Sequence, residues 1–425
     1  MDKQGLIIGI DYTNEYCQAC YYSARHNSPE SVASGTEVMR YLIPTALSYD
    51  SENDDWLIGQ AAIDHARETG AYLFEDLLAN IFLDEKCYVN DREYSYTQLL
   101  AVFFGKLIEL TQLTTSILSI ENITVNLREI DHEIKQAIYE VFALLRLPAE
   151  KIKLQSCAES FVYYVLEEDR SLWEKGAELF DFSGEGFFEK QLSVSKGPDG
   201  EEFVYVYENT HNDDFSYEGL ENYAYVDHMD ERLLTLFHEV IAENPISSVY
   251  FTGKGFTELW FGKTLQEVSE NARAFKGNNL YAKGACLAGV RRASGDKKDY
   301  NIICDGRTKA TIAVEASYKG SLCILNLSKA PVDYFDAGLV TDFILDNIQT
   351  VRFYITSLVS RERTFVDFDL STFPQRPNKT TRVEIEIKYL NDCECEISIT
   401  DKGFGEFFKG SGEKVVKRLN MEGYV

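Results

Sequence analysis

Two stretches of this 425-residue chain begin in the same way. Residues 6–13 read LIIGIDYT and residues 177–183 read AELFDFS, so each is an apolar strand with an aspartate, Asp11 or Asp181, near its end. A second β-forming segment follows each strand: CQACYYSA after a turn at residues 13–15, and FFEKQLSVSK directly after SGEG. This repetition predicts two related halves, each opening with a strand and a hairpin.

Apolar periodicity predicts strands alternating with helices downstream of each hairpin. In the first half we expect a third strand at 45–49, helical spacing between 56 and 83, helices at 95–113, 132–145 and 158–166, and strands at 122–126 and 151–154. In the second half we expect a hairpin turn at 197–200, helices at 229–242 and 279–293, and a strand at 247–252. Strands separated by helices favour parallel sheets and an α/β fold.

The pattern changes after residue 309. Short alternating segments such as ATIAVEA, SLCILNL, VRFYITSL and RVEIEIKY recur with turns between them, which predicts a C-terminal all-β sandwich. Residues 294–301 are rich in Gly, Lys and Asp and are typical of a linker. A short helix-like piece is expected at 412–421.

Composition limits the classes of function. The 42 Lys and Arg against 69 Asp and Glu give a formal charge of −27 without a basic patch, which argues against nucleic acid and anionic membrane as partners. No apolar run approaches the ~18 residues of a membrane span. Nine scattered cysteines, with Cys17 and Cys20 predicted on opposite faces of a strand, fit a reducing, cytoplasmic location. The acidic run at 199–231 is expected to be a solvated loop.

Several ordered segments resemble the DnaK-type chaperones, the seventy-kilodalton heat-shock proteins of the actin-like ATPase superfamily. LIIGIDYTNEYC and LFDFSGEGF are similar to the family's two phosphate-binding hairpins, and LQSCAESFVYYVL and YAKGACLAGVRRASGD to its two connecting helices. SSVYFTGKGFTEL is similar to its adenosine loop, and Ile302-Ile303-Cys304-Asp305 to its interdomain linker. DLSTFPQRPNKTTRVEIEIKYLNDCECEISITDKGFGE resembles its substrate-binding β-domain.

The resemblance implies two RNase-H-like lobes around a cleft, followed by a C-terminal all-β sandwich. The implied domains are a first actin-like lobe at 1–177, a second lobe at 178–296 lacking most of the adenosine-clamping subdomain, a β-sandwich at 305–410 and a short tail at 411–425. The resemblance implies ATP or ADP with Mg²⁺ as cofactors, and Asp11 and Asp181 as residues that hold the metal. The implied nucleotide-binding residues are Asp11, Thr13, Asn14, Asp181, Ser183, Gly184, Gly186, Gly253 and Gly255.

The sequence also departs from the family in ways that predict weak nucleotide binding or none. Glu15 and Glu185 stand in the two hairpin turns, where carboxylates repel phosphate. Ile63 matches the family's catalytic lysine, and Ser156 stands at its water-positioning glutamate. We therefore expect no catalytic residues and no efficient ATPase.

Three functions stay open at this stage. The first is a chaperone-like protein that binds protein or extended peptide with little or no ATP hydrolysis. The second is an active ATP-dependent chaperone-like ATPase, and the third is an actin-like scaffold protein. Asp11 and Asp181 could also be plain turn residues, and Gly253 and Gly255 a plain β-turn.

Overall fold

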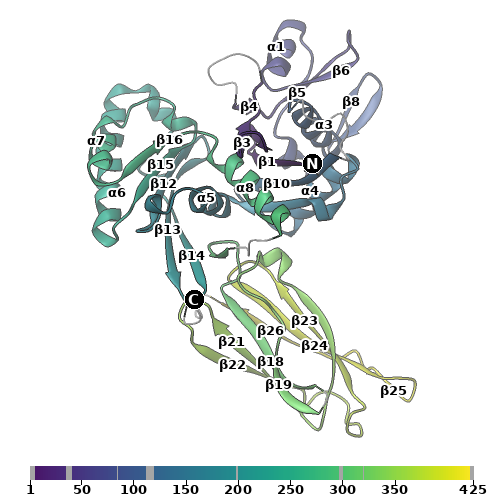
Figure 1. The fold of residues 1–425 in the computed structure, drawn as a ribbon. Helices are drawn as coiled ribbons and strands as arrows, with labels where there is room; N and C mark the ends of the chain where they lie inside the picture. The colour runs from purple at the N-terminus through teal and green to yellow at the C-terminus, as the bar shows by residue number, and fades with distance from the viewer. Residues whose placement is uncertain are drawn as a thin grey trace. The chain divides into compact units, whose positions relative to one another are not determined.

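The computed structural model describes residues 5–34, 41–83, 85–111, 119–197, 200–295, 300–318 and 320–421. The chain divides into two compact units, Met1–Tyr300 and Asn301–Val425 (Figure 1). The first is a mixed α/β region with mixed sheets, and the second is mostly antiparallel β-structure. Among the helices described, none combines the length and the apolar character needed to cross a bilayer.

The first sheet has the strand order β11-β10-β1-β2-β3. β1 pairs antiparallel with β2 and parallel with β10, which pairs parallel with β11. Its elements are β1 (Leu6–Tyr12), β2 (Tyr16–Ser23), β3 (Ser28–Ser31), α3 (Tyr96–Glu109), β10 (Ile120–Leu127), α4 (His132–Leu144), β11 (Ile152–Ser156) and α5 (Cys157–Leu166). Between β3 and α3 lie β4 (Ile43–Pro44), β5 (Leu47–Asp50), β6 (Asp55–Ile58), α1 (Gln60–Thr69), β7 (Leu73–Phe74), α2 (Leu77–Ile81), β8 (Lys86–Val89) and β9 (Arg92–Ser95).

The second sheet repeats this plan. Its order β16-β15-β12-β13-β14 has the same parallel and antiparallel neighbours in the same positions. The elements are β12 (Ala177–Ser183), β13 (Gly186–Lys196), β14 (Glu202–Thr210), α6 (Tyr223–Glu243), β15 (Ser248–Thr252), α7 (Gly262–Asn271), β16 (Arg273–Lys276) and α8 (Leu280–Ser294). The internal repeat predicted from Asp11 and Asp181 therefore extends to strand order and to the helices between the strands. We refer below to residues 5–166 as the first lobe and to residues 177–294 as the second lobe.

The last helix of each lobe packs against the other lobe. α8 lies against β1, where a Cβ on Gly9 would come within 2.3 Å of the Ala282 carbonyl oxygen. α5 contacts the second sheet through Phe161, whose ring centroid is 5.9 Å from that of Tyr250 on β15. The two helices also contact each other, and Figure 1 shows them between the sheets. The lobes are thus joined by two exchanged helices.

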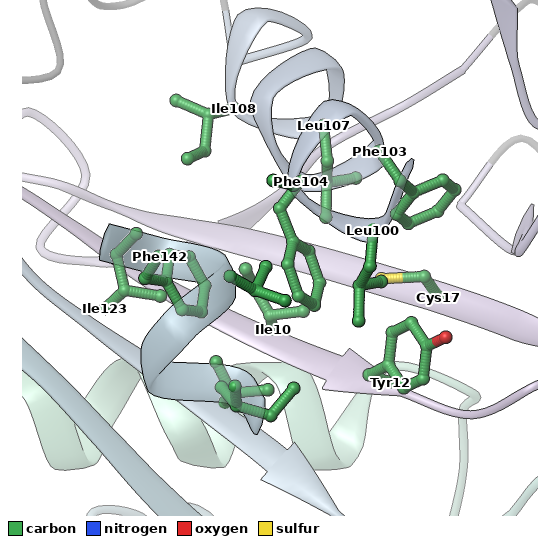
Figure 2. Close-up of a cluster of buried hydrophobic side chains, with 14 of the residues drawn as sticks. Ile10, Tyr12, Cys17, Leu100, Phe103, Phe104, Leu107, Ile108, Ile123 and Phe142 are labelled. Atoms are coloured by element: carbon green, nitrogen blue, oxygen red, sulfur yellow. The ribbon is translucent and has the colours of Figure 1, made fainter. Parts of the chain in front are cut away.

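Each lobe has its own hydrophobic core on the outer side of its sheet. In the first lobe, Ile10 and Tyr12 of β1 face α3 and α4, and the Phe104 ring stacks on Phe142 at 5.1 Å (Figure 2). Burial on both faces explains why β1 is a continuous apolar run rather than an alternating one. Cys17 lies in this core while Cys20 lies on the α8 side, which confirms that the two thiols point to opposite faces.

The second unit contains two antiparallel sheets, ordered β19-β18-β21-β22 and β20-β23-β24-β25, and β26 also pairs with β24 in the latter. Inward-facing residues alternate along the strands, as the sequence pattern predicted. Its elements are β17 (Asn301–Ile303), β18 (Ala310–Tyr318), β19 (Ser321–Asn326), β20 (Leu339–Ile344), β21 (Thr350–Ser357), β22 (Arg363–Asp369), β23 (Arg382–Tyr389), β24 (Glu394–Phe404), β25 (Phe408–Lys409) and β26 (Lys414–Asn420).

The prediction of a helix at 412–421 is wrong. Residues 414–420 form β26, which pairs antiparallel with β24 over its full length. Pairing with β24 satisfies its backbone groups, and Leu419 is buried, so the sheet decides the local structure. The expected turn at 197–200 and linker at 294–301 fall partly outside the described residues.

Gly284 allows α5 and α8 to approach closely. A Cβ at this position would lie 1.9 Å from the Ser160 carbonyl oxygen on α5. We expect Gly284→Ala to lower the stability of the first unit by roughly 2 kcal/mol or more, because backbone must move to accommodate the methyl group. All three tryptophans lie in this unit, so urea unfolding followed by tryptophan fluorescence measures the effect.

The matched control is Gly262→Ala at the start of α7, where nothing lies within 4 Å of the added Cβ. This variant should be neutral or slightly stabilising, since alanine favours a helix over glycine. Equal effects of the two substitutions would contradict the close-approach explanation.

Glu178 is a buried acid on β12, and neither of its carboxyl oxygens lies within hydrogen-bond geometry of a partner among the residues that the structure describes. Burial raises its pKa well above the ordinary value, and the nearby Glu189 adds to this shift. The folded state therefore retains a proton that the unfolded chain releases near pH ~4.3, so the stability of the first unit falls as pH rises above that value.

We expect Glu178→Gln to be more stable than the wild type at pH ~8, with the difference shrinking toward pH ~4. Urea titrations across this range with tryptophan detection measure the difference. The exposed Glu174→Gln serves as the control and should follow the wild type at every pH. Parallel stability curves for wild type and Glu178→Gln would rule out the assigned pKa shift.

Candidate functional site

A cavity opens between the two lobes at the carboxyl ends of their parallel strands. This is where ligands bind in open α/β sheets, because the loops that leave the strands can shape a site there. Five of the sequence-predicted site residues line it: Asp11, Thr13, Asp181, Ser183 and Gly253. Other lining residues come from the first hairpin and the segment before β4, from the second hairpin turn, from the ends of β10 and β15, and from α5, α8 and the residues before α8: Glu15, Tyr16, Gln18, Leu42, Arg128, Cys157, Glu185, Thr252, Lys254, Asn278 and Tyr281.

The guanidinium group of Arg128 is held by carboxylates inside this cavity. Its Nη1 and Nη2 atoms both donate to Asp181 Oδ2 at 3.1 Å, and Nε donates to Glu185 Oε2 at 2.5 Å. The guanidinium carbon also lies 4.2 Å from the centroid of the Phe188 ring. Asp181 is almost fully buried and accepts a further hydrogen bond from the Tyr281 hydroxyl at 2.9 Å. Arg128 of the first lobe is thus bound by the second.

Charge pairing compensates for the burial of Arg128. Burial is the largest single effect and disfavours the charged guanidinium, but Asp181 and the other nearby acidic groups together outweigh it and keep the pKa of Arg128 above its ordinary value. Burial also raises the pKa of Tyr281, and the neighbouring Asp181 adds to the rise. Arg128 is therefore a cation and Tyr281 a neutral hydrogen-bond donor near neutral pH.

Asp11 also lines the cavity but belongs to a separate hydrogen-bond network. Its Oδ1 accepts from Asn126 Nδ2 at 2.7 Å, and Asn126 Oδ1 accepts from the Ser160 hydroxyl at 2.6 Å. Burial raises the pKa of Asp11 to about 7, although Asn126 and Arg128 act in the opposite direction. Burial likewise raises the pKa of the neighbouring Cys157 thiol to about 12, which disfavours its thiolate form near neutral pH.

These contacts do not fit a hydrated Mg²⁺ held between Asp11 and Asp181. Oδ2 of Asp181 already accepts from three donors, two of them on a guanidinium group whose charge would repel a metal ion. The structure brings the two predicted aspartates to one cavity but places an arginine where the metal was expected.

Side-chain hydroxyl groups in both hairpin turns form hydrogen bonds with backbone groups of the same turn. The Thr13 hydroxyl donates to the Tyr16 carbonyl at 2.8 Å and accepts from the Tyr16 N–H. In the second turn, Ser183 Oγ accepts from the Glu185 N–H at 3.3 Å. Asn14 is exposed and does not line the cavity.

The glycines in this region are required by packing. A Cβ on Gly184 would lie 3.0 Å from Glu15 Oε2 of the other lobe, so the two turns face each other closely. Gly186 has a φ of +139°, and a Cβ there would strike Asn212 Oδ1. Gly253 has a φ of +89° with no room beside the Phe182 carbonyl, and Gly255 packs against the Phe182 ring. Of these four glycines, Gly253 alone lines the cavity.

Lys254 lies between Gly253 and Gly255 in the sequence, and its side chain reaches the first lobe. Its Nζ donates to Glu15 Oε1 at 2.8 Å and to the Tyr16 hydroxyl at 2.7 Å. Burial opposes its charge, but Glu15 and Tyr16 raise the pKa of Lys254 above its ordinary value. Lys254 thus binds the acid that was expected to repel phosphate.

The two positions that match catalytic residues of the resembled family have other surroundings. Ser156 caps the N-terminus of α5: its Oγ accepts from the Glu159 N–H at 3.2 Å, and its own N–H donates to Glu159 Oε2 at 2.9 Å. Ile63 is a half-buried residue of α1. Neither lines the cavity.

Sequence reasoning missed Arg128, Lys254, Asn126 and Tyr281. A signal existed for the two cations: Arg128 directly follows β10 and Lys254 follows β15 by two residues, at the carboxyl ends of strands that flank β1 and β12. Nothing in the local pattern distinguished them from surface cations.

Two family models match the chain. Residues 28–305 match a family described as "Family of unknown function (DUF5716) C-terminal". The chain belongs to the DUF5716 family. Residues 307–421 match "Domain of unknown function (DUF8552)", so the two matches meet close to the boundary between the compact units at Tyr300. None of the curated proteins compared with this DUF5716 chain matches it.

Proposed function

We propose that this DUF5716 protein is a chaperone-like protein with an actin-type pair of lobes that does not use ATP and acts by binding protein or extended peptide. The first unit would consist of two RNase-H-like lobes around a cleft, and the second unit would be a β-sandwich related to a chaperone substrate-binding domain. The observation that carries the proposal is the guanidinium group of Arg128 seated on Asp181, between the hairpins that would otherwise face phosphate.

The repeated topology supports the first half of this proposal. Each lobe runs strand, strand, strand, helix, strand, helix, strand, helix, and the two final helices are exchanged between the lobes. In the first lobe, residues 32–95 are inserted between β3 and α3. In the second lobe, the corresponding connection between β14 and α6 spans only residues 211–222. A short connection leaves little chain to cover an adenosine group, which favours weak nucleotide binding or none.

The second unit carries an exposed strand edge that suits an extended peptide. In the part of the chain that the structure describes, β19 pairs with β18 alone and forms the edge of its sheet. Its sequence, SLCILN, has no charged residue, and Leu322 and Ile324 are 73% and 49% exposed. Such an edge can accept an added strand through its backbone groups, with apolar side chains contributing affinity.

The two units differ strongly in formal net charge. The first unit has 26 Lys and Arg against 51 Asp and Glu, a formal charge of −25, whereas the second has 16 against 18 and a charge of −2. The nearly neutral unit is therefore the better acceptor for an uncharged extended segment, while the acidic unit disfavours polyanions.

We expect about 5 mM Mg-ATP to leave the melting temperature of the full-length protein unchanged, because a ligand that binds only the folded state must raise it by mass action. Steady-state phosphate release should stay at the detection limit. Tryptophan fluorescence and a coupled phosphate assay measure the two quantities, with MgCl₂ alone as the control. Saturable stabilisation with turnover abolished by Asp11→Asn would support the active ATPase instead.

We expect the full-length protein to bind a fluorescein-labelled eight-residue peptide of alternating leucine and serine with a dissociation constant of roughly 1–100 μM. Fluorescence anisotropy measures the binding. Ile324→Lys on β19 should weaken it at least ~10-fold, because a charged side chain on an edge strand opposes pairing.

The matched control is Val340→Lys on β20, the edge of the other sheet, where Val340 is 60% exposed. This variant should bind like the wild type. Absence of saturable binding at high micromolar peptide would favour a purely structural role for the second unit.

A further inference from the structure

The two lobes contact each other through a pair of ion pairs that mirror the internal repeat. Each hairpin turn carries one glutamate, Glu15 in the turn between β1 and β2 and Glu185 in the turn between β12 and β13. Each glutamate is bound by a cation from the opposite lobe: Lys254 binds Glu15 and Arg128 binds Glu185. Each cation stands at the end of the strand that runs parallel to the first strand of its own lobe, β10 beside β1 and β15 beside β12.

The Arg128 contact has the features of a complete guanidinium-binding site. Asp181 accepts from both terminal nitrogens, Glu185 accepts from Nε, and the Phe188 ring lies against the guanidinium face. The Asp181 side chain is only 2% exposed, and its position is fixed by the Tyr281 hydroxyl of α8. A planar fork of donors matched by two carboxylates and an aromatic face is the pattern in which arginine cannot be exchanged for lysine.

The Lys254 contact is more open but closes the other side of the cavity. Its ammonium group lies 4.5 Å from the centroid of the Tyr16 ring in addition to its two hydrogen bonds. The side chains of Lys254 and Glu15 are 29% and 46% exposed, so solvent screens this pair more than the first.

We infer that the cavity is a cation-binding site that the chain fills with its own side chains, and that Arg128 and Lys254 form a reciprocal latch holding the two lobes together without a bound ligand. Four acids face the cavity, Asp11, Glu15, Asp181 and Glu185, and the two cations neutralise half of their full formal charge. Removing a cation leaves acids of both lobes facing each other, which drives the lobes apart. The inference rests on these contacts alone and requires neither peptide binding nor the absence of ATP hydrolysis.

Chemical rescue tests the guanidinium site. Arg128→Ala should lower the melting temperature of the first unit, followed by tryptophan fluorescence, by roughly 5 °C or more. Methylguanidinium at about 10 mM, far below denaturing concentrations, should raise the melting temperature of Arg128→Ala by mass action and leave the wild type unchanged. The control Arg25→Ala, at an exposed position, should melt like the wild type and not respond.

Unchanged melting of Arg128→Ala, or a melting temperature that does not respond selectively to methylguanidinium, would overturn the inference. If Arg128→Ala does not fold, Glu185→Gln and Lys254→Met give a second test. Each should lower the melting temperature, and the double variant should melt below either single variant, because each substitution removes one of the two ion pairs between the lobes. A wild-type melting temperature in both single variants would refute the latch.

These measurements use no nucleotide and no peptide. If methylguanidinium fails to rescue Arg128→Ala and Mg-ATP does not stabilise the wild type, the latch is refuted and the proposed function stands. If methylguanidinium rescues the variant and Mg-ATP stabilises the wild type, the latch stands and the proposed function is refuted.

Discussion

The contact between Arg128 and Asp181 decides what the cavity between the lobes can be. A buried carboxylate at the end of β12 needs a partner, because an isolated charge in that position would be costly. Here the partner is a guanidinium group supplied by the other lobe, and it uses the oxygen that a metal ion would otherwise approach. Tyr281 from α8 adds a third donor, so the exchanged helix and the ion pair stabilise the same arrangement of lobes.

The internal repeat makes this arrangement possible. Two sheets with the same strand order place equivalent loops opposite each other, and the glycines that permit close packing, Gly9 and Gly284, bring α8 against β1 and α5. Side chains at equivalent positions then meet across the cavity in pairs. The pairs of Glu15 with Lys254 and of Glu185 with Arg128 therefore follow from one structural plan applied twice.

Much of the fold could be predicted from the sequence because its signals are local. The apolar runs around Ile10 and Phe180, the capping residue Ser95 before α3, and the alternation in β21 and β23 all depend on neighbouring residues. The internal repeat also predicted that Asp11 and Asp181 would lie near the same cavity, and both of them line it. The ion pairing of Arg128 and the strand β26 could not be predicted, because the first depends on carboxylates more than 50 residues away and the second on its pairing with β24. The acids of the hairpin turns were recognised, but their partners were not.

The cations and acids of the cavity are energetically coupled, which explains why they occur together. Replacing Arg128 alone would leave Asp181 and Glu185 as unpaired carboxylates that repel phosphate as strongly as they attract a cation. Replacing Glu15 alone would leave the ammonium group of Lys254 beside Tyr16 without its carboxylate partner. No single substitution therefore turns the cavity into a phosphate-binding site, since each ion pair would have to change on both sides and in both lobes. The cavity is therefore organised by ion pairs between the lobes, and each pair depends on one residue from either side.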